Sequence, residues 1–168
     1  MARRVLAALL GVGLTVPALF SGVADATHSP GDGPPNDFVV GGGHHSVPDT
    51  QFTLSAHSGP LGEDAKGHLS FKIDDGPRFI ADVTCLIVVG NEAFATGVIR
   101  RPASSAGDLV VMHAVDNGNP SDPTTPDLLR FSFTGSIFES PTDPGCFLPV
   151  LPPVPVTEGN IVVHDAVS

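Results

Sequence analysis

The amino-acid sequence predicts an all-β protein: a single antiparallel β-barrel or β-sandwich of about seven or eight strands that follows a signal peptide. Three observations support this fold class. Apolar and polar residues alternate with a period of two in several segments, and glycines and prolines separate these segments. No segment beyond the N-terminus shows the 3.6-residue period of an amphipathic helix. The pattern does not separate a barrel from a sandwich, so both remain open.

Residues 1–26 have the three regions of a secretory signal peptide. A start with two arginines precedes an apolar stretch at residues 5–20, and Ala24-Asp25-Ala26 forms a cleavage site before Thr27. The apolar stretch is shorter than the roughly 20 residues that cross a bilayer, and it contains glycine and proline. We therefore expect a secreted, extracellular protein that begins at Thr27 and has no membrane span after cleavage.

The exported chain is strongly acidic. The full sequence has 8 basic and 18 acidic residues, and removal of the signal peptide takes away two arginines and one aspartate, which leaves a net charge of −11. Such a surface repels phosphate backbones and anionic lipid head groups, so nucleic acid and membrane surfaces are disfavoured partners. The chain also has no Trp and no Tyr, which anchor most sugar-stacking sites and protein-recognition hot spots. A small ligand remains open.

The exported chain divides into three parts. Residues 27–49 are expected to be a flexible Gly/Pro-rich leader, because prolines and the run Gly41-Gly42-Gly43 interrupt regular ladders; at most residues 38–40 would pair at a sheet edge. Residues 50–168 form the all-β domain. Within it, residues 140–158 are expected to be a Pro-rich strap without a ladder, because proline lacks the backbone N–H donor.

The alternation places the strands of this domain. Residues 78–89 carry apolar side chains on both faces, which predicts a central strand covered on both sides, with Phe79, Ala81, Val83 and Cys85 on one face. Strands are expected at residues 51–57, 66–74, 78–89, 92–100, 108–115, 129–133 and 161–165.

The two cysteines, Cys85 and Cys146, both lie in the exported part. In an oxidising compartment an isolated pair is most simply a disulfide. It would close a loop of about 60 residues and stabilise the fold by about 4 kcal/mol. A two-cysteine metal site is the rival interpretation.

The connection after residue 115 is the main candidate for a metal site. The candidate ligands in it are Asp116, Asn117, Asp122 and Asp127. Clustered carboxylate and amide oxygens on a Gly-containing loop suit Ca²⁺. The spacing differs from that of an EF-hand, and Asn, Gly and Pro could equally supply turn geometry alone. Calcium is the one cofactor that the sequence suggests.

Several short stretches carry a resemblance. They are Val83-Thr84-Cys85-Leu86, Gly90-Asn91-Glu92-Ala93, Val115-Asp116-Asn117-Gly118 and Gly159-Asn160-Ile161-Val162-Val163. With them, the chain from about residue 51 to its C-terminus resembles a group of small secreted β-domain proteins of actinomycetes. The resemblance implies that a cysteine of a central strand pairs with one in the Pro-rich strap. It supplies no activity and no catalytic residues.

Motifs for catalysis are missing from the sequence. It has no G-x-S-x-G nucleophile motif, and the run Gly41-Gly42-Gly43 lacks the Lys and Ser/Thr of a phosphate-binding loop. We therefore predict a secreted non-enzymatic β domain with a structural or weak binding role at the cell exterior. One alternative is a barrel-type carrier of a small apolar ligand, which requires an internal cavity. A remote alternative is an extracellular hydrolase, which requires a cleft with converging titratable groups.

Overall fold

The structure, a computed structural model, describes residues 36–118, 124–133, 137–139, 145–149 and 151–166. The signal peptide expected at residues 1–26 lies outside the described residues, as do residues 27–35 of the leader, Asp122, and parts of the strap. No helix in the described ranges is long and apolar enough to cross a membrane.

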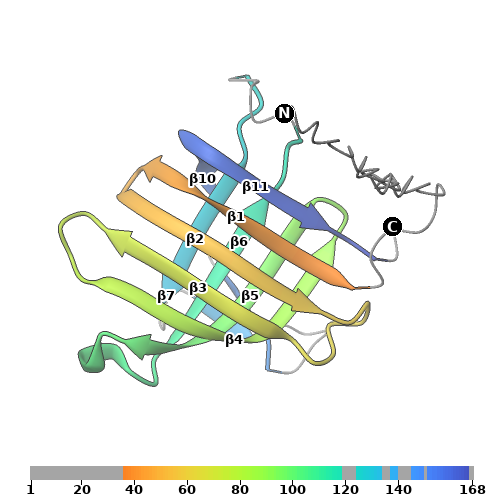
Figure 1. Cartoon of the computed structure of the whole chain (residues 1–168), viewed down its shortest axis with the longest axis horizontal. Helices are drawn as coiled ribbons and strands as arrows, with labels where there is room; N and C mark the ends of the chain where they lie inside the picture. Colours follow the sequence, from red (N-terminus) through yellow and green to blue (C-terminus); the bar gives the residue numbers. More distant parts are fainter. Residues whose placement is uncertain (1–35, 119–123, 134–136, 140–144, 150, 167–168) are drawn as a thin grey trace, which may run out of the picture. The chain divides into compact units, whose positions relative to one another are not determined.

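Nine strands form one antiparallel sheet in the order β10-β7-β6-β5-β4-β3-β2-β1-β11, and β8 pairs with β9 in a small second sheet (Figure 1). The predicted all-β class is confirmed, although the main sheet has more strands than expected. The elements are β1 (Asp37–Ser46), β2 (Asp49–Ser58), β3 (Lys66–Ile73), β4 (Arg78–Val89), β5 (Glu92–Arg101), the 3-10 helix η1 (Ala103–Ser105), β6 (Leu109–Val115), β7 (Leu128–Phe133), β8 (Ile137–Glu139), β9 (Phe147–Pro149), β10 (Val154–Pro155) and β11 (Glu158–His164).

The main sheet curls so that its two edges approach each other. Its edge strands β10 and β11 are separated in the chain only by Val156 and Thr157. The amide of Val156 donates to the carbonyl of Asp127 beside β7, and the amide of Thr157 donates to the carbonyl of His44 in β1, each over 2.8 Å. The sheet is therefore an open barrel, and Figure 1 shows β11, β1, β2 and β3 in front of β5, β6 and β7.

The expectation of a flexible leader is wrong for residues 37–49. Residues 37–46 form β1, which lies between β2 and β11, and β2 begins at Asp49. The glycine run belongs to this strand because β11 comes very close: a β-carbon on Gly43 would clash with the carbonyl of Glu158. Glycine here permits close approach of two backbones, and its low strand propensity conceals the strand in the sequence.

Aromatic rings from opposite sides of the sheet meet in the interior of the barrel. Phe71 is fully buried and stacks on Phe79 and Phe131, with ring centroids 5.1 and 4.2 Å apart, and it packs against Phe133 at 5.8 Å. The surrounding core consists of inward-facing aliphatic residues, among them Leu54, Leu69, Ala81, Ile99, Val110, Met112, Leu129 and Ile161. Period-two alternation therefore identifies the inward faces of most strands.

A bulge in β4 changes which face its side chains occupy. The register with β5 shifts between Val83 and Cys85, so the alternation reverses there. Leu86 and Val88 join the main core, whereas Cys85 lies on the other face of the sheet. Unbroken alternation would have placed Cys85 on the same face as Val83. Cys85 begins a row of directly opposed, buried residues across β4 to β7, continued by Thr96, Val111 and Ser132.

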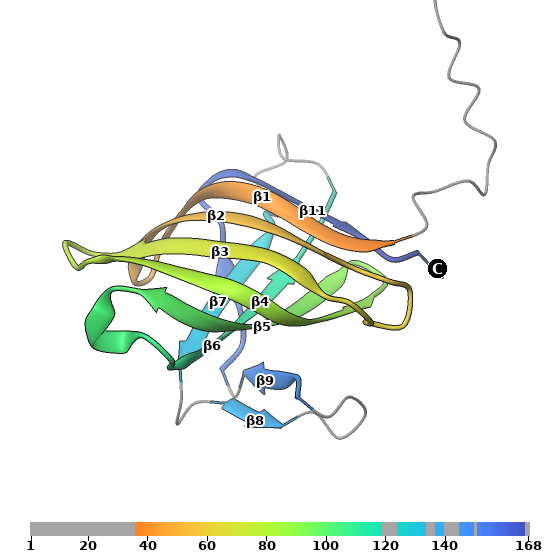
Figure 2. The same cartoon turned by 60° about the horizontal axis from the view of Figure 1, so that its bottom comes forward.

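The β8–β9 hairpin packs on the outside of the barrel beside β5 and β6, as Figure 2 shows. The prediction that residues 140–158 form a Pro-rich strap without a ladder is therefore wrong in part. Its described part contains β9 and β10, each paired with a neighbouring strand. Each of these short strands ends at a proline, Pro149 and Pro155, and β9 adds a layer over strands that would otherwise be exposed.

Candidate functional site

A groove of about 670 Å³ crosses the outer face of the sheet, and we call it the outer groove. The register places Glu158 opposite His44, His44 opposite Gln51, Gln51 opposite Lys72, and Lys72 opposite Arg78. Because opposed residues of neighbouring strands share a face, this row runs across five strands from β11 to β4. The outer groove is lined by Gly43, His44, Gln51, Phe52, Thr53, Arg78, Glu158 and Gly159.

Glycine backbone forms part of the groove surface. Gly43 and Gly159 are directly opposed in β1 and β11. Gly159 has φ +101°, in the left-handed region that disfavours side chains, and a β-carbon there would clash with the carbonyl of Gly42. Side chains at these positions would disrupt the pairing of β1 with β11. The two glycines thus keep the strands together and leave the groove open above them.

His44 is held at both ring nitrogens. Its Nδ1 lies 3.0 Å from Oγ1 of Thr157, and its Nε2 lies 2.8 Å from Oδ1 of Asp49. The hydroxyl of Thr157 also lies 3.1 Å from the carbonyl of His44, to which it can donate. The side chain of His44 is 28% exposed and that of Asp49 is 66% exposed. This chain of polar contacts joins the β1–β2 turn to the segment that leads into β11.

Charged groups of opposite sign lie at the two ends of the outer groove. Glu158 lies on β11, and Arg78 lies on β4, where its Nη1 donates to Oγ of Ser70 over 3.1 Å. A smaller groove of about 240 Å³ adjoins at Gln51, which lines both grooves. The smaller groove is lined by Asp49, Gln51, Lys72, Asp74 and Asp75. Gln51 and Thr53 therefore lie in the middle of the outer groove, with Glu158 at one end and Arg78 at the other.

Three of the four predicted calcium ligands, Asp116, Asn117 and Asp127, lie near one another, and Asp122 lies outside the described residues. All four carboxylate oxygens of the two described aspartates accept backbone N–H groups. Asp127 accepts those of Asn117 at 2.9 Å and Ile161 at 2.8 Å. Asp116 accepts those of Gly118 at 2.7 Å and Val163 at 3.0 Å. Within the ranges that the structure describes, no group of three or more His, Cys, Asp or Glu residues is arranged to hold a metal ion.

These aspartates close the barrel. Ile161 and Val163 are alternate residues of edge strand β11, so their amides point to the same side, away from β1. The carboxylates of Asp127 and Asp116 accept from these amides where a further strand would otherwise supply carbonyls. The acidic residues that the sequence marks as candidate ligands thus have a structural role at the edge of the sheet.

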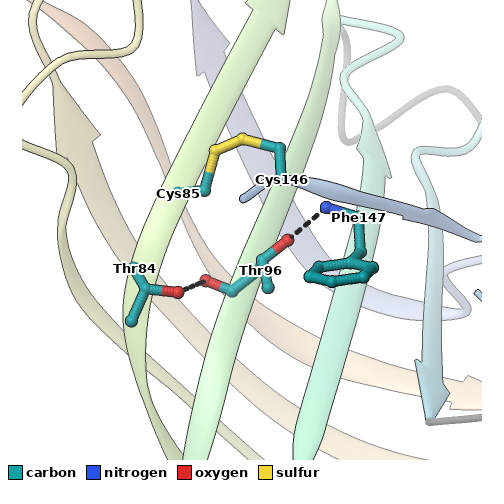
Figure 3. The surroundings of a disulfide bond; sticks show 5 residues. All are labelled: Thr84, Cys85, Thr96, Cys146 and Phe147. Atoms are coloured by element: carbon teal, nitrogen blue, oxygen red, sulfur yellow. Dashed lines mark hydrogen bonds between the residues drawn. A yellow bond between two sulfur atoms is a disulfide. The ribbon is translucent and has the colours of Figure 1, made fainter. Parts of the chain in front are cut away.

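The disulfide between Cys85 and Cys146 is present, with 5.4 Å between the two Cα atoms, and this prediction is confirmed (Figure 3). Beside it, Thr96 Oγ1 accepts the amide of Phe147 over 2.8 Å. Thr84 donates its hydroxyl to the carbonyl of Thr96 over 3.4 Å. The disulfide and the Thr96 contact together fasten the strap to the outer face of β4 and β5.

Sequence reasoning did not identify the outer groove. His44 fell in the segment interpreted as a leader, and Thr157 and Glu158 fell in the strap interpreted as having no ladder. The predicted strand at residues 66–74 did include Lys72, one residue of the row. Residues that meet only through the register of five strands give no local signal, although the pair of glycines at Gly43 and Gly159 marks where two backbones approach.

No protein-family model matches the chain, and comparisons with curated proteins and with solved structures find no match either.

Proposed function

We propose that the chain is an exported, non-enzymatic β-barrel domain that binds a small polar ligand in the outer groove at the cell exterior. The observation that carries this proposal is the row from Glu158 to Arg78, which has a carboxylate at one end, the cations Lys72 and Arg78 at the other, and His44 and Gln51 between them. Export is supported by the N-terminal sequence, by the disulfide and by the resemblance to small secreted actinomycete proteins.

The charges at its ends favour a zwitterionic ligand. Five neighbouring strands place the Cα atoms of Glu158 and Arg78 roughly 19 Å apart, at about 4.8 Å per strand. Both side chains are long, so their charged ends can lie several ångströms closer than their Cα atoms. A short peptide of about three residues spans roughly 10 Å when extended. Its amine would pair with Glu158, its carboxylate with Arg78, and its backbone with Gln51.

This proposal is tested by NMR titration of the uniformly ¹⁵N-labelled exported chain with tri-alanine. We expect amide shifts at Gly43, Gln51 and Gly159, and smaller shifts with tri-alanine that is acetylated and amidated at its ends. Glu158→Gln and Arg78→Gln should each weaken binding by about tenfold, as the loss of one charge-assisted contact predicts. Two results would contradict the proposal: the absence of shifts in the groove, or equal binding of the free and the blocked peptide.

A matched control is available at the other end of the sheet. Lys66 is an exposed cation at the start of β3, outside the residues that line the outer groove. Lys66→Gln changes the net charge by the same amount as Arg78→Gln. It should leave tri-alanine binding unchanged if the local contact, and not the overall charge, is responsible.

The contacts of His44 favour a hydrolase as second candidate. Thr157, His44 and Asp49 form a hydroxyl–imidazole–carboxylate chain like that of a nucleophilic triad. In such a reaction Thr157 Oγ1 would attack an ester carbonyl, His44 would take the hydroxyl proton and return it to the leaving alcohol, and water would then hydrolyse the acyl-threonine. However, the single hydroxyl proton of Thr157 can also be donated to the carbonyl of His44. The side chains of His44 and Asp49 are in addition exposed to water. Both features weigh against an activated nucleophile.

Hydrolysis of p-nitrophenyl acetate distinguishes the two candidates. A non-enzymatic domain gives the same rate for the wild type and for Thr157→Val, because surface histidines alone then account for any hydrolysis. A rate that falls at least a hundredfold in Thr157→Val would favour the hydrolase. The alternative of a carrier for an apolar ligand needs an apolar internal cavity. Stacked rings around Phe71 fill the part of the interior where they lie, so that part gives the carrier no support.

A further inference from the structure

The second histidine of the adjacent pair, His45, faces the opposite way from His44. It is 2% exposed, and it pairs across the β1–β2 hairpin with Thr50, which is 1% exposed. Its ring is tilted against that of Phe52, with centroids 6.4 Å apart. Successive strand residues point to opposite faces, so the two histidines divide between the outer groove and the interior.

Among the residues that the structure describes, neither ring nitrogen of His45 has a hydrogen-bond partner. The carbonyl of Pro48 in the adjoining turn interacts with the ring, but it does not meet hydrogen-bond geometry and already accepts the hydroxyl of Thr50 over 3.0 Å. A buried polar group without a partner costs stability. A charged imidazole at the same place would cost more, because it would also lose its hydration.

The charges around His45 reinforce the preference for the neutral ring. Burial has the largest effect and lowers the pKa of His45 below its ordinary value of 6.5. The positive charge of Arg130 on β7 lowers it further, as does the neighbouring imidazole of His44, whereas the Pro48 carbonyl and the Asp49 carboxylate at the start of β2 act in the opposite direction.

We propose that His45 is an acid-sensitive switch: a proton on its buried imidazole opens the turn at residues 46–49, while the rest of the barrel stays folded. The carbonyl of Pro48, in this turn, interacts with the ring of His45. The turn lies at the end of a hairpin, where opening breaks few contacts. Asp49 lies at the same turn and holds His44. Opening therefore also removes one of the two contacts that hold the ring of His44, which lines the outer groove. The switch does not depend on which ligand, if any, the groove binds.

The direction of the effect follows from proton linkage. In the open form His45 is hydrated and binds a proton with its ordinary pKa of 6.5, whereas the closed form binds a proton only at lower pH. The open form therefore carries more protons in the window just below pH 6.5. As the pH falls through this window, the opening equilibrium rises by up to about tenfold per pH unit.

The experiment is hydrogen exchange of the oxidised exported chain at pH 7.5 and pH 5.5, with rates expressed as protection factors. We expect protection at residues 45–50 to fall by up to about tenfold between the two values, and protection in β5 and β6 to stay constant. His45→Leu should remove the response, because the side chain no longer titrates. His68→Gln, which removes an exposed histidine on β3, should keep it. Constant protection of the turn, or the same loss in His45→Leu, would overturn the proposal.

A measurement on the wild type covers the case in which His45→Leu does not fold. NMR titration of the histidine Cε1–H resonances reports each ring separately. We expect His45 to titrate below its ordinary value of 6.5, with line broadening of the turn amides in the same range. Titration of His45 at this ordinary value would show that the ring is hydrated in the closed form and would also overturn the proposal.

Discussion

Replacement of Asp127 tests the idea that carboxylates close the barrel. Asp127 is 6% exposed, and its two oxygens accept the amides of Asn117 and Ile161. Asp127→Ala leaves both amides without their acceptor. Ile161 is 1% exposed, so water cannot readily replace the carboxylate at its amide, whereas Asn117 is exposed and can be hydrated.

The expected loss follows from these two environments. An unsatisfied buried donor costs about 1–3 kcal/mol, and a hydrogen bond to a charged group is worth about 1.5–3 kcal/mol before water compensates at the exposed amide. We therefore expect Asp127→Ala to lower the free energy of unfolding by about 2–4 kcal/mol. Asp127→Asn keeps one acceptor oxygen and should lose about half as much.

Urea unfolding measures this loss. With a slope of about 2 kcal/mol per molar urea, the midpoint for Asp127→Ala should fall by roughly 1–2 M. Hydrogen exchange should show the Ile161 amide losing protection first. Asp75→Ala, at an exposed aspartate, is the matched control and should stay within about 0.5 kcal/mol of the wild type. A loss for Asp127→Ala no larger than that of the control would refute the proposed role of the carboxylate.

Three further predictions concern the disulfide, the pH dependence of stability and calcium. Replacing Cys85 and Cys146 together by alanine should lower the free energy of unfolding by about 4 kcal/mol, because the bond closes a loop with a sequence separation of 61 residues; a loss below about 1 kcal/mol in urea unfolding would contradict this. Burial raises the pKa of Asp37 above 3.8, so the folded state binds more protons than the unfolded state just above that pH, and stability should fall as the pH rises through this window. Asp37→Asn should remove this fall, and an unchanged pH profile of the midpoint would disprove the assignment. Millimolar Ca²⁺ should leave the melting temperature unchanged, since backbone amides already occupy the carboxylate oxygens of Asp116 and Asp127; a rise that disappears in Asp116→Asn would restore the calcium hypothesis.

The strands that alternate cleanly could be predicted from the sequence. The predicted strand at residues 51–57 lies within β2, because one of its faces is buried in the core, and the predicted strand at residues 78–89 coincides with β4, which is apolar on both faces. The bulge after Val83 could not be predicted from the sequence, because it depends on how β4 pairs with β5. β1 was missed because its three glycines, which the closeness of β11 requires, have no side chains to alternate.

The chemistry of single residues was harder to predict than the strands. Asp116 and Asp127 were recognised as oxygen donors at one place, but the sequence does not show that the amides of β11 would meet them. His44 and Thr157 are 113 residues apart and meet only because the barrel brings β10 and β11 beside opposite edges of the sheet. Contacts of this kind follow from closure of the whole sheet, and no local pattern encodes them.

Native mass spectrometry of the oxidised protein purified from culture medium tests the central claim most directly. The proposed function predicts a chain of residues 27–168 that lacks two hydrogens and carries a small polar adduct. It also predicts that the adduct is lost, with the fold retained, when Glu158→Gln and Arg78→Gln are combined. An adduct that is retained in this variant, a wild-type chain without any adduct, or a chain that still begins at Met1 would contradict the claim of an exported domain that binds its ligand in the outer groove.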